Sequence, residues 1–238
     1  IRREYKAELE VGAPKVNYRE APTEAVSFNY RHKKQTGGSG QFAHVIGHMV
    51  PLGDDATEDY VFENRVTGGR IPTEYIPSVD KGFQMARGKG PLAGFEIVKV
   101  QMILEDGTSH SVDSSDLAFQ ICARDAFREA FMRSKPALLE PIMKVEIETP
   151  TDLQGNVAGD ISARRGLITH SEVKRNTTII NAEVPLARMF GYATGLRSMT
   201  QGQATFTMVF HTYRRTPASV QEEVIAQIKD AEKQKKSK

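Results

Sequence analysis

The sequence predicts an α+β protein of two domains, the second of which is ferredoxin-like. The 238 residues are 39% hydrophobic and 26% charged, which is ordinary for a globular chain long enough to form two modest cores. Strand-like alternation opens the first half, and two helical patterns follow it. The second half carries strand and helix patterns in the order β-α-β-β-α-β, the order of a ferredoxin-like sandwich of helices on an antiparallel sheet.

Alternation of apolar and polar residues predicts the strands of the first half. Glu8–Val11 has the pattern of a strand with no partner before it, and the first residue is Ile1 rather than Met, so we expect a fragment of a longer protein. After Lys15–Arg19 the alternation recurs in three segments that we expect to form one antiparallel sheet: Val26–Tyr30, Phe42–Ile46 and Tyr60–Val66.

Two helices and one strand complete the first domain. Pro77 suits the first turn of a short helix, which we expect to run to the glycines that begin at Gly88. Phe95–Leu104 then has the pattern of a strand. The polar run Asp113–Asp116 is expected to cap a long amphipathic helix that extends to Lys135, where the following proline stops it.

The second half predicts a regular series of elements and a basic tail. In order, we expect a strand at Ile142–Glu148, a helix at Thr151–Arg165, two strands across Gly166–Val184, a helix at Ala187–Thr200 and a strand at Ala204–Tyr213. A last helix is expected from Val220 to about Lys229. The lysine-rich segment Glu232–Lys238 after it has the composition of a frayed, solvated terminus.

Net charge and cysteine use exclude several classes of protein. The formal net charge is only +2, so the chain is not a uniformly basic nucleic-acid binder, and any such role must rest on local patches. The single cysteine, Cys122, lies in a helical pattern and suits core packing in a reducing compartment. Because the sequence has no signal peptide and no apolar run of membrane-spanning length, we expect a cytoplasmic location.

The segment Tyr30–Gln41, YRHKKQTGGSGQ, is the strongest local signal for binding. It has three fixed positive charges and no acid, and three of four successive residues near its end are glycine. Glycines reach positive φ without steric cost and leave backbone amides open, while Lys and Arg attract phosphate, so the segment suits contact with a nucleic-acid backbone. A flexible hairpin loop with solvated lysines explains the same residues, and this segment alone leaves both interpretations open.

Patterns for metal binding and catalysis fail on spacing. His44 and His48 are four residues apart, which suits zinc on a helix, but in a strand this separation spans about 13 Å, too far for one ion without a bulge. Gly82–Lys89 resembles a phosphate-binding loop, yet its glycines are too far apart and Gly90 stands where Ser or Thr must hold magnesium. We therefore expect no catalytic residue and no metal site in this chain.

Seven ordered segments, which together cover nearly all of Arg3–Pro217, closely resemble bacterial elongation factor G. They are KQTGGSGQFAHV (Lys34–Val45), IPTEYIPSVDKGF (Ile71–Phe83), GPLAGFEIVKVQMIL (Gly90–Leu104), HSVDSSDLAF (His110–Phe119), KPALLEPIMKVEIETP (Lys135–Pro150), GDISARRG (Gly159–Gly166) and EVPLARMFGYATGLRSMTQGQATFTMVF (Glu183–Phe210). The resemblance implies the end of that family's third domain at residues 1–10, its fourth domain at 11–136, its fifth at 137–217, and a C-terminal helix with a basic tail at 218–238.

The resemblance also implies a fold and a set of partners. The fourth domain is expected to be a left-handed β-α-β module like that of a small-subunit ribosomal protein, and the fifth to be ferredoxin-like. GTP and Mg²⁺ are expected to bind a preceding domain, so this chain has no cofactor even if the full-length protein is a GTPase. The implied function is tRNA–mRNA translocation by a monomeric, ribosome-binding arm that meets the small-subunit decoding centre, the large-subunit factor-binding site, tRNA and mRNA.

Two loops carry the expected RNA contacts at the far tip of the fourth domain. In the family, both enter the decoding centre. Gln35 matches the position that approaches the codon–anticodon duplex, and His110 matches the position of diphthamide in the archaeal and eukaryotic counterpart. A lone histidine before a helix cap is also often only a local hydrogen-bonding residue. The expected RNA-binding residues are Lys33, Lys34, Gln35, Thr36, Gly37, Gly38, Ser39, Gly40, Ser109, His110 and Ser111.

Arg164 and Arg165 are expected to contact large-subunit rRNA, although paired arginines at a helix end also complement its dipole. Ser39 replaces a basic residue that is common in the family, and Tyr30–Arg31 replaces a glycine-containing approach, which suggests a paralogue. Three alternatives therefore remain: a ribosome-recycling paralogue, a ribosome-protection protein with different tip loops, and a free-standing ferredoxin-like metabolic enzyme. For the last, the sequence offers no convergent ionisable residues.

Overall fold

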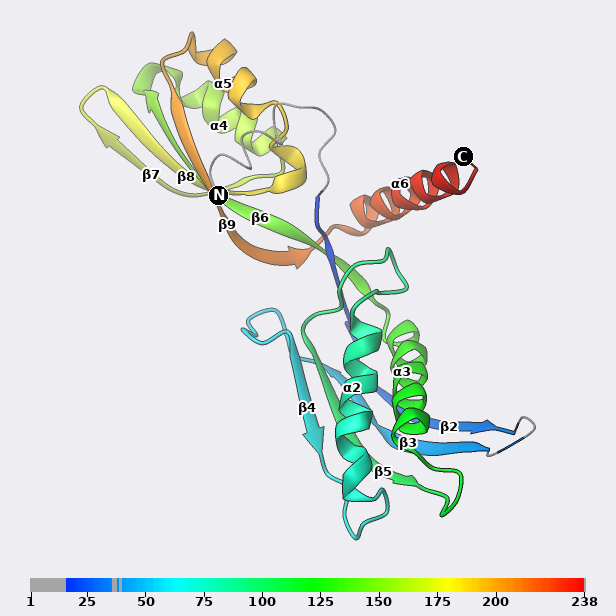
Figure 1. Cartoon of the computed structure of the whole chain (residues 1–238). Coiled ribbons are helices and arrows are strands. Elements are labelled where there is room, and N and C mark those ends of the chain that lie inside the picture. The colour runs from blue at the N-terminus through cyan, green and yellow to red at the C-terminus, as the bar shows by residue number, and fades with distance from the viewer. Residues whose placement is uncertain (1–15, 36–37, 39, 238) are drawn as a thin grey trace. The chain divides into compact units, whose positions relative to one another are not determined.

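The computed structural model describes residues 16–35, 38 and 40–237, and the chain divides into two compact units (Figure 1). The hairpin unit comprises Arg19–Leu139 and the described residues from Thr216 onward. The sandwich unit comprises Glu140–Arg215 and the described residues up to Tyr18. Strand β6 (Ala137–Pro150) begins in the hairpin unit and continues in the sandwich unit. The predicted strand Glu8–Val11 lies outside the described residues.

The hairpin unit is built on a four-stranded sheet in the order β2-β3-β5-β4. The first three of these, β2 (Val26–Lys34), β3 (Gln41–Pro51) and β5 (Val100–Thr108), pair antiparallel. β4 (Tyr60–Asn64) is parallel to β5, so the prediction of one antiparallel sheet is wrong for this strand. The helix α2 (Ile76–Arg87) lies between them in sequence, and a helical crossover is what brings two such strands into parallel register. The hand of this β4-α2-β5 crossover stays a prediction.

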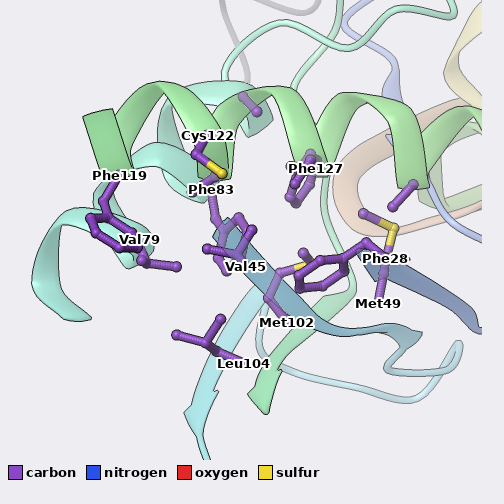
Figure 2. Close-up of a cluster of buried hydrophobic side chains, with 14 of the residues drawn as sticks. Phe28, Val45, Met49, Val79, Phe83, Met102, Leu104, Phe119, Cys122 and Phe127 are labelled. Atoms are coloured by element: carbon purple, nitrogen blue, oxygen red, sulfur yellow. The ribbon is translucent and has the colours of Figure 1, made fainter. Parts of the chain in front are cut away.

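Helices α2 and α3 (Asp116–Arg133) lie side by side on one face of this sheet (Figure 1). Gly82 permits their close approach, because a Cβ here would lie 2.3 Å from the Gln120 carbonyl oxygen. Cys122 is fully buried, and burial raises the pKa of its thiol to about 12, so it serves packing rather than nucleophilic chemistry. The layer between helices and sheet includes Phe28, Val45, Met49, Phe83 and Phe127 (Figure 2).

Strand β5 begins at Val100, later than the predicted start at Phe95. The residues before Val100 are bonded elsewhere: the Phe95 N–H donates to the buried carboxylate of Glu20 at 2.7 Å, and the N–H groups of Ile97 and Val98 donate to the carbonyls of Arg87 and Glu20, each at 2.8 Å. The Glu20 carboxylate also accepts the N–H groups of Leu92 and Ala93 in the preceding loop, at 2.8 and 3.2 Å. N–H groups bonded in this way cannot join a sheet ladder. Glu20 itself lies in β1 (Arg19–Ala21), which pairs antiparallel with the first residues of β6.

The sandwich unit confirms the predicted ferredoxin-like order. Its strands are arranged β9-β6-β8-β7 across the sheet, and helices α4 and α5 cover one face (Figure 1). The buried cluster between the two layers includes Met143, Val157, Ile161 and Tyr192. With the hairpin unit, this makes the chain an α+β protein. The elements are α4 (Gln154–Ala163), β7 (Leu167–Lys174), β8 (Thr177–Pro185), α5 (Tyr192–Thr200) and β9 (Thr205–Arg215).

Short 3₁₀ turns precede three of the helices, and for α4 and α5 the helix starts beyond the predicted residue. The turns η1 (Thr73–Tyr75), η2 (Thr151–Leu153) and η3 (Leu186–Arg188) each follow a proline in an extended conformation. As a result, α4 begins at Gln154 rather than Thr151, and α5 begins at Tyr192 rather than Ala187. The proline restricts its own φ angle, and the 3₁₀ turn that follows it precedes the α-helix.

The C-terminal helix α6 (Ala218–Lys236) is longer than predicted. The lysine-rich segment was expected to be frayed, but it remains helical through Lys236. Lys, Gln and Glu are good helix formers, so the lysine-rich segment can continue the helix that begins at Ala218. Within the described part of the chain, no helix is both long and apolar enough to cross a membrane.

Candidate nucleic-acid interface

The hairpin of β2 and β3 leads into the basic glycine loop. The last paired residues are Lys34 and Gln41, and His32 Nε2 lies 2.9 Å from Oε1 of Gln41 across the strands. Lys33, Lys34 and Gln35 are exposed, and neither lysine forms an ion pair within the described ranges. Gly38 and Gly40 are described, whereas Thr36, Gly37 and Ser39 lie outside the described residues. This end of the unit therefore offers two lysine charges that no acid among the described residues neutralises.

The second expected loop is a turn that follows β5 and folds back on itself. Ser109, His110 and Ser111 are all exposed. The Nδ1 atom of His110 accepts hydrogen bonds from the backbone N–H groups of Val112 and Asp113, at 3.2 and 3.1 Å. A further bond runs from the His110 N–H to the hydroxyl of Ser114 at 2.8 Å. His110 thus forms the local hydrogen bonds that the sequence analysis gave as an alternative to RNA binding. Among the described residues, these bonds use only one of its two ring nitrogens.

The structure brings the two loops together at one end of the hairpin unit. The Phe42 N–H donates to the carbonyl of Asp113 at 2.9 Å, and the Ser114 hydroxyl donates to the carbonyl of Phe42 at 2.8 Å. The rings of Phe42 and His110 have centroids 6.3 Å apart. Because Phe42 is the second residue of β3, these contacts attach the turn to the base of the basic loop.

Three residues that hold this end together were not predicted as part of the site: Phe42, Asp113 and Ser114. The run from Asp113 to Asp116 was expected only to cap a helix. Ser115 does this, since its hydroxyl oxygen accepts the N–H of Ala118 at 3.1 Å. The neighbouring Ser114 is free of the helix and joins the loops instead. A second serine beside the capping serine was the one available signal.

His44 and His48 lie on the same strand, β3, and serve separate partners. His44 is buried, with Nε2 2.6 Å from Asn29 Oδ1 and Nδ1 3.0 Å from Thr108 Oγ1. Burial, reinforced by the nearby charge of Arg31, lowers the pKa of His44. His48 pairs instead with the carboxylate of Glu105. Over the described ranges, no three His, Cys, Asp or Glu side chains gather into a metal site.

Arg164 stands at the end of α4 and is bound on several sides by its own unit. Its guanidinium donates to Asp160 Oδ2 at 3.0 Å and to the carbonyls of Arg188 and Phe190 at 2.7 and 3.2 Å. It also lies over the ring of Tyr192, 5.0 Å from the centroid. These contacts tie α4 to the segment that leads into α5, so the main use of this side chain is internal.

Arg165, like Arg164, bonds to groups within the sandwich unit. It adopts a positive φ of 58° just after α4, and its two terminal nitrogens donate to the two carboxylate oxygens of Glu140 at 3.0 and 2.9 Å. The Glu140 side chain is only 4% exposed, so this paired geometry neutralises a buried charge. Sequence reasoning placed Arg165 on rRNA, and the structure shows that its guanidinium plane already faces a carboxylate.

Comparisons with known proteins agree with the geometry. Residues 14–135 match the protein family described as Elongation factor G, domain IV, and residues 137–224 match Elongation factor G C-terminus. The chain belongs to the elongation factor G family. It is 56% identical over 232 residues to elongation factor G of Rhodopirellula baltica, and the match covers 98% of this chain and 33% of that protein.

Two further proteins are similar to this chain over most of its length. Elongation factor G 1 of Syntrophus aciditrophicus is 51% identical over 96% of this chain and 32% of its own length. A crystal structure of a protein from Thermus thermophilus is 36% identical and superposes with a TM-score of 0.82, covering 92% of this chain and 32% of that one. The chain thus spans about a third of the length of the relatives it matches.

In this member of the elongation factor G family, the two regions expected to contact RNA differ in the groups that they can offer to a ligand. The end of the hairpin unit presents Lys33, Lys34, Gln35 and the Nε2 atom of His110, which has no hydrogen-bond partner among the described residues. Cations without an acidic partner suit phosphate, and an amide or imidazole suits 2′-hydroxyls and base edges. At the end of α4, in contrast, the guanidinium groups are largely committed to protein acceptors.

Proposed function

We propose that this chain is the ribosome-binding arm of a translational GTPase of the elongation factor G type. In this proposal the end of the hairpin unit enters the decoding centre of the small subunit and promotes movement of tRNA and mRNA. The protein acts as a monomer in the cytoplasm. The observation that carries the proposal is the attachment of the His110 turn to the basic loop through Phe42, Asp113 and Ser114.

The proposed contacts follow from the chemistry of the exposed groups. Lys33 and Lys34 hold phosphate through an attraction that weakens with salt. Gln35 and His110 reach 2′-hydroxyls and base edges in the shallow minor groove of an RNA duplex, where contacts tolerate any sequence. Tolerance of sequence is what a factor that moves every codon needs. The tip then works through shape and charge, not through bond chemistry.

The remaining parts of the cycle are proposed to lie elsewhere. GTP and Mg²⁺ bind a preceding domain of the full-length protein, and hydrolysis there biases the arm toward the decoding centre. The sandwich unit meets the large-subunit factor-binding site. Any rRNA contact by Arg164 or Arg165 would use donors left over from their bonds within the unit, so we expect it to be weaker than the contacts at the tip.

The test separates movement from hydrolysis in a full-length elongation factor G that carries this chain as its last third. We expect Gln35→Ala or His110→Ala to slow translocation about ten- to a hundredfold, because each removes hydrogen bonds to RNA. Ribosome-stimulated GTP hydrolysis should stay near its normal rate, since the nucleotide is bound elsewhere. Stopped-flow translocation and single-turnover hydrolysis on the same proteins measure both. Normal translocation in both variants would remove the tip from the mechanism.

The same assay distinguishes the recycling paralogue. Ser39 and the Tyr30–Arg31 approach depart from the family pattern, which is the observation in favour of this second candidate. A wild-type protein that splits ribosomes together with recycling factor but does not move tRNA would establish the recycling role instead.

A further inference from the structure

The turn between β5 and α3 holds His110 in one chemical form. We propose that this turn fixes His110 as a hydrogen-bond donor through Nε2, aimed at an acceptor atom in an RNA minor groove, and that Ser114 is the residue that positions it. The inference rests on the proposed function for the identity of the ligand, but not for the state of the ring.

The state of the ring follows from its Nδ1 contacts. Both groups that face Nδ1 at hydrogen-bond distance are backbone N–H donors, those of Val112 and Asp113 at 3.2 and 3.1 Å. A backbone N–H can donate only to an atom with a free lone pair, so Nδ1 carries no proton. In a neutral imidazole the proton then resides on Nε2. The nearest carboxylate oxygen, Asp113 Oδ2, is 3.7 Å from Nδ1, which is too far for a hydrogen bond that would compete.

The other side of the ring is available to a ligand. The His110 side chain is 53% exposed, and Nε2 has no hydrogen-bond partner within the described part of the chain. It therefore presents a single N–H donor and no acceptor. The acceptors that fit it are a ribose 2′-oxygen, a pyrimidine O2 or a purine N3, which every RNA duplex offers in its minor groove whatever its sequence.

Ser114 supplies the rigidity that such a donor requires. Its hydroxyl has one hydrogen, which it gives to the Phe42 carbonyl at 2.8 Å, while its oxygen accepts the His110 N–H at the same distance. The Ser114 carbonyl in turn accepts the hydroxyl of Tyr75 at 3.3 Å. Tyr75 stacks on Phe119 of α3 with centroids 4.9 Å apart. The turn is thus fastened both to β3 and to the helical layer, as an oriented binding group needs to be.

Nitrogen-15 spectroscopy of the histidine rings tests the state of His110 directly, using the chain alone. We expect the neutral ring of His110 in the wild-type chain to show Nδ1 unprotonated and Nε2 protonated. Ser114→Ala should move both nitrogen signals toward averaged values as the turn loosens, and Ser114→Thr, which keeps the hydroxyl, should restore them. A proton on Nδ1 in the wild-type chain, or identical spectra in the Ser114→Ala and wild-type chains, would overturn the proposal.

A matched pair of substitutions tests the function of the donor in the full-length factor. In His110→Gln the amide nitrogen can occupy the place of Nε2 and donate, although the bonds to Nδ1 are lost. In His110→Asn the amide oxygen can accept the two backbone N–H groups, but no donor reaches the place of Nε2. We expect translocation to fall about tenfold for Asn but only about threefold for Gln, which keeps a donor and loses the bonds that orient it.

The outcomes also separate this inference from the proposed function. Equal loss in both variants, or a greater loss for Gln than for Asn, would contradict the donor role while leaving the tip in the mechanism. Normal translocation in both variants and in His110→Ala would instead overturn the proposed function at this residue. The nitrogen spectra would then still report whether the turn holds the ring as described.

Discussion

Two groups of basic residues were expected to contact RNA, and the structure gives them opposite surroundings. Lys33 and Lys34 are exposed at the end of β2, with no ion pair in the described part of the chain. Arg164 and Arg165, at the end of α4, are bonded to carbonyls, to Asp160 and to the buried Glu140. A lysine keeps its charge available because its flexible stem is easily left in solvent, whereas the planar fork of arginine suits fixed acceptors inside a fold.

This comparison separates two uses of positive charge in one protein. At the tip, lysine charge that no described residue neutralises is available for phosphate. At the end of α4, charge stabilises the sandwich unit, and its removal should be felt as instability before it is felt as weaker binding. Measurements of unfolding free energy therefore distinguish these two uses of charge.

The largest expected effect is that of Arg165→Met. This change leaves the nearly buried carboxylate of Glu140 without its partner, and we expect it to destabilise the sandwich unit by about 3 kcal/mol. Urea unfolding followed by hydrogen-exchange mass spectrometry reports on each unit separately. Arg165→Lys is the control, because it keeps the charge but loses the paired geometry, and it should recover only part of the loss. A cost below about 1 kcal/mol for the Met variant would contradict the assignment of Arg165 to the fold.

Arg164→Met should have the next largest effect. It removes donors to the carbonyls of Arg188 and Phe190 and the contact with the Tyr192 ring, but it leaves no fully buried charge behind. We expect a loss of about 1–2 kcal/mol, measured in the same way. Protection of α5 amides should fall more than protection of β7, since the bonds join α4 to the segment before α5. A stable variant that binds ribosomes poorly would move Arg164 to the RNA-binding group.

A smaller effect is expected from pH, and it should appear in the hairpin unit. Burial lowers the pKa of His44, so the unfolded chain takes up a proton more readily than the folded one. The contribution of His44 to stability is then complete above its ordinary value of 6.5 and is lost as pH falls through the lowered folded value. His44→Gln should flatten this part of the stability curve. Glu183 in the sandwich unit has a lowered pKa through its bond to Arg214, so its contribution should be lost only below the ordinary carboxyl value of 4.5.

The smallest effect on stability is expected at the tip. Replacing Lys33 and Lys34 together by Gln should leave the unfolding free energy within about 0.5 kcal/mol of normal, because neither side chain has an ionic partner to lose in the described part of the chain. The same variant in a full-length factor should bind ribosomes less tightly, with a salt dependence reduced by about two phosphate contacts. Titrations at several salt concentrations measure this. An unchanged salt slope would show that these lysines are solvated and touch no phosphate.

Local sequence signals predicted most elements of the fold because they depend on neighbouring residues. The cap at Ser115, the β-α-β-β-α-β order and the basic hairpin loop are all of this kind. Strand direction is not, because alternation looks the same in parallel and antiparallel strands, and so the pairing of β4 was wrong. The late start of β5 also could not be predicted, since the N–H groups before Val100 bond to Arg87 and to Glu20, and Glu20 is distant in sequence.

Part of the candidate site could also be predicted from the sequence. Glycine and lysine spacing found the hairpin loop, and the resemblance to a family found His110. The joining residues Phe42 and Ser114 were missed, because their roles depend on contacts between segments far apart in the chain. For the same reason, sequence alone could not decide whether Arg165 faces RNA or protein, since its partner Glu140 lies in another strand.

A photocrosslinker at two exposed positions of the hairpin unit tests most directly whether the tip is the RNA-binding end. Val112 lies in the His110 turn and is 76% exposed, whereas Met132 is 54% exposed near the far end of α3, about 24 Å along the helix axis from its start. With p-benzoylphenylalanine at each position in a full-length factor bound to ribosomes, we expect Val112 to crosslink to mRNA, tRNA or small-subunit rRNA, and Met132 not to do so. Equal RNA crosslinking from the two positions, or crosslinks from Val112 to protein alone, would contradict the claim that the tip is the RNA-binding end.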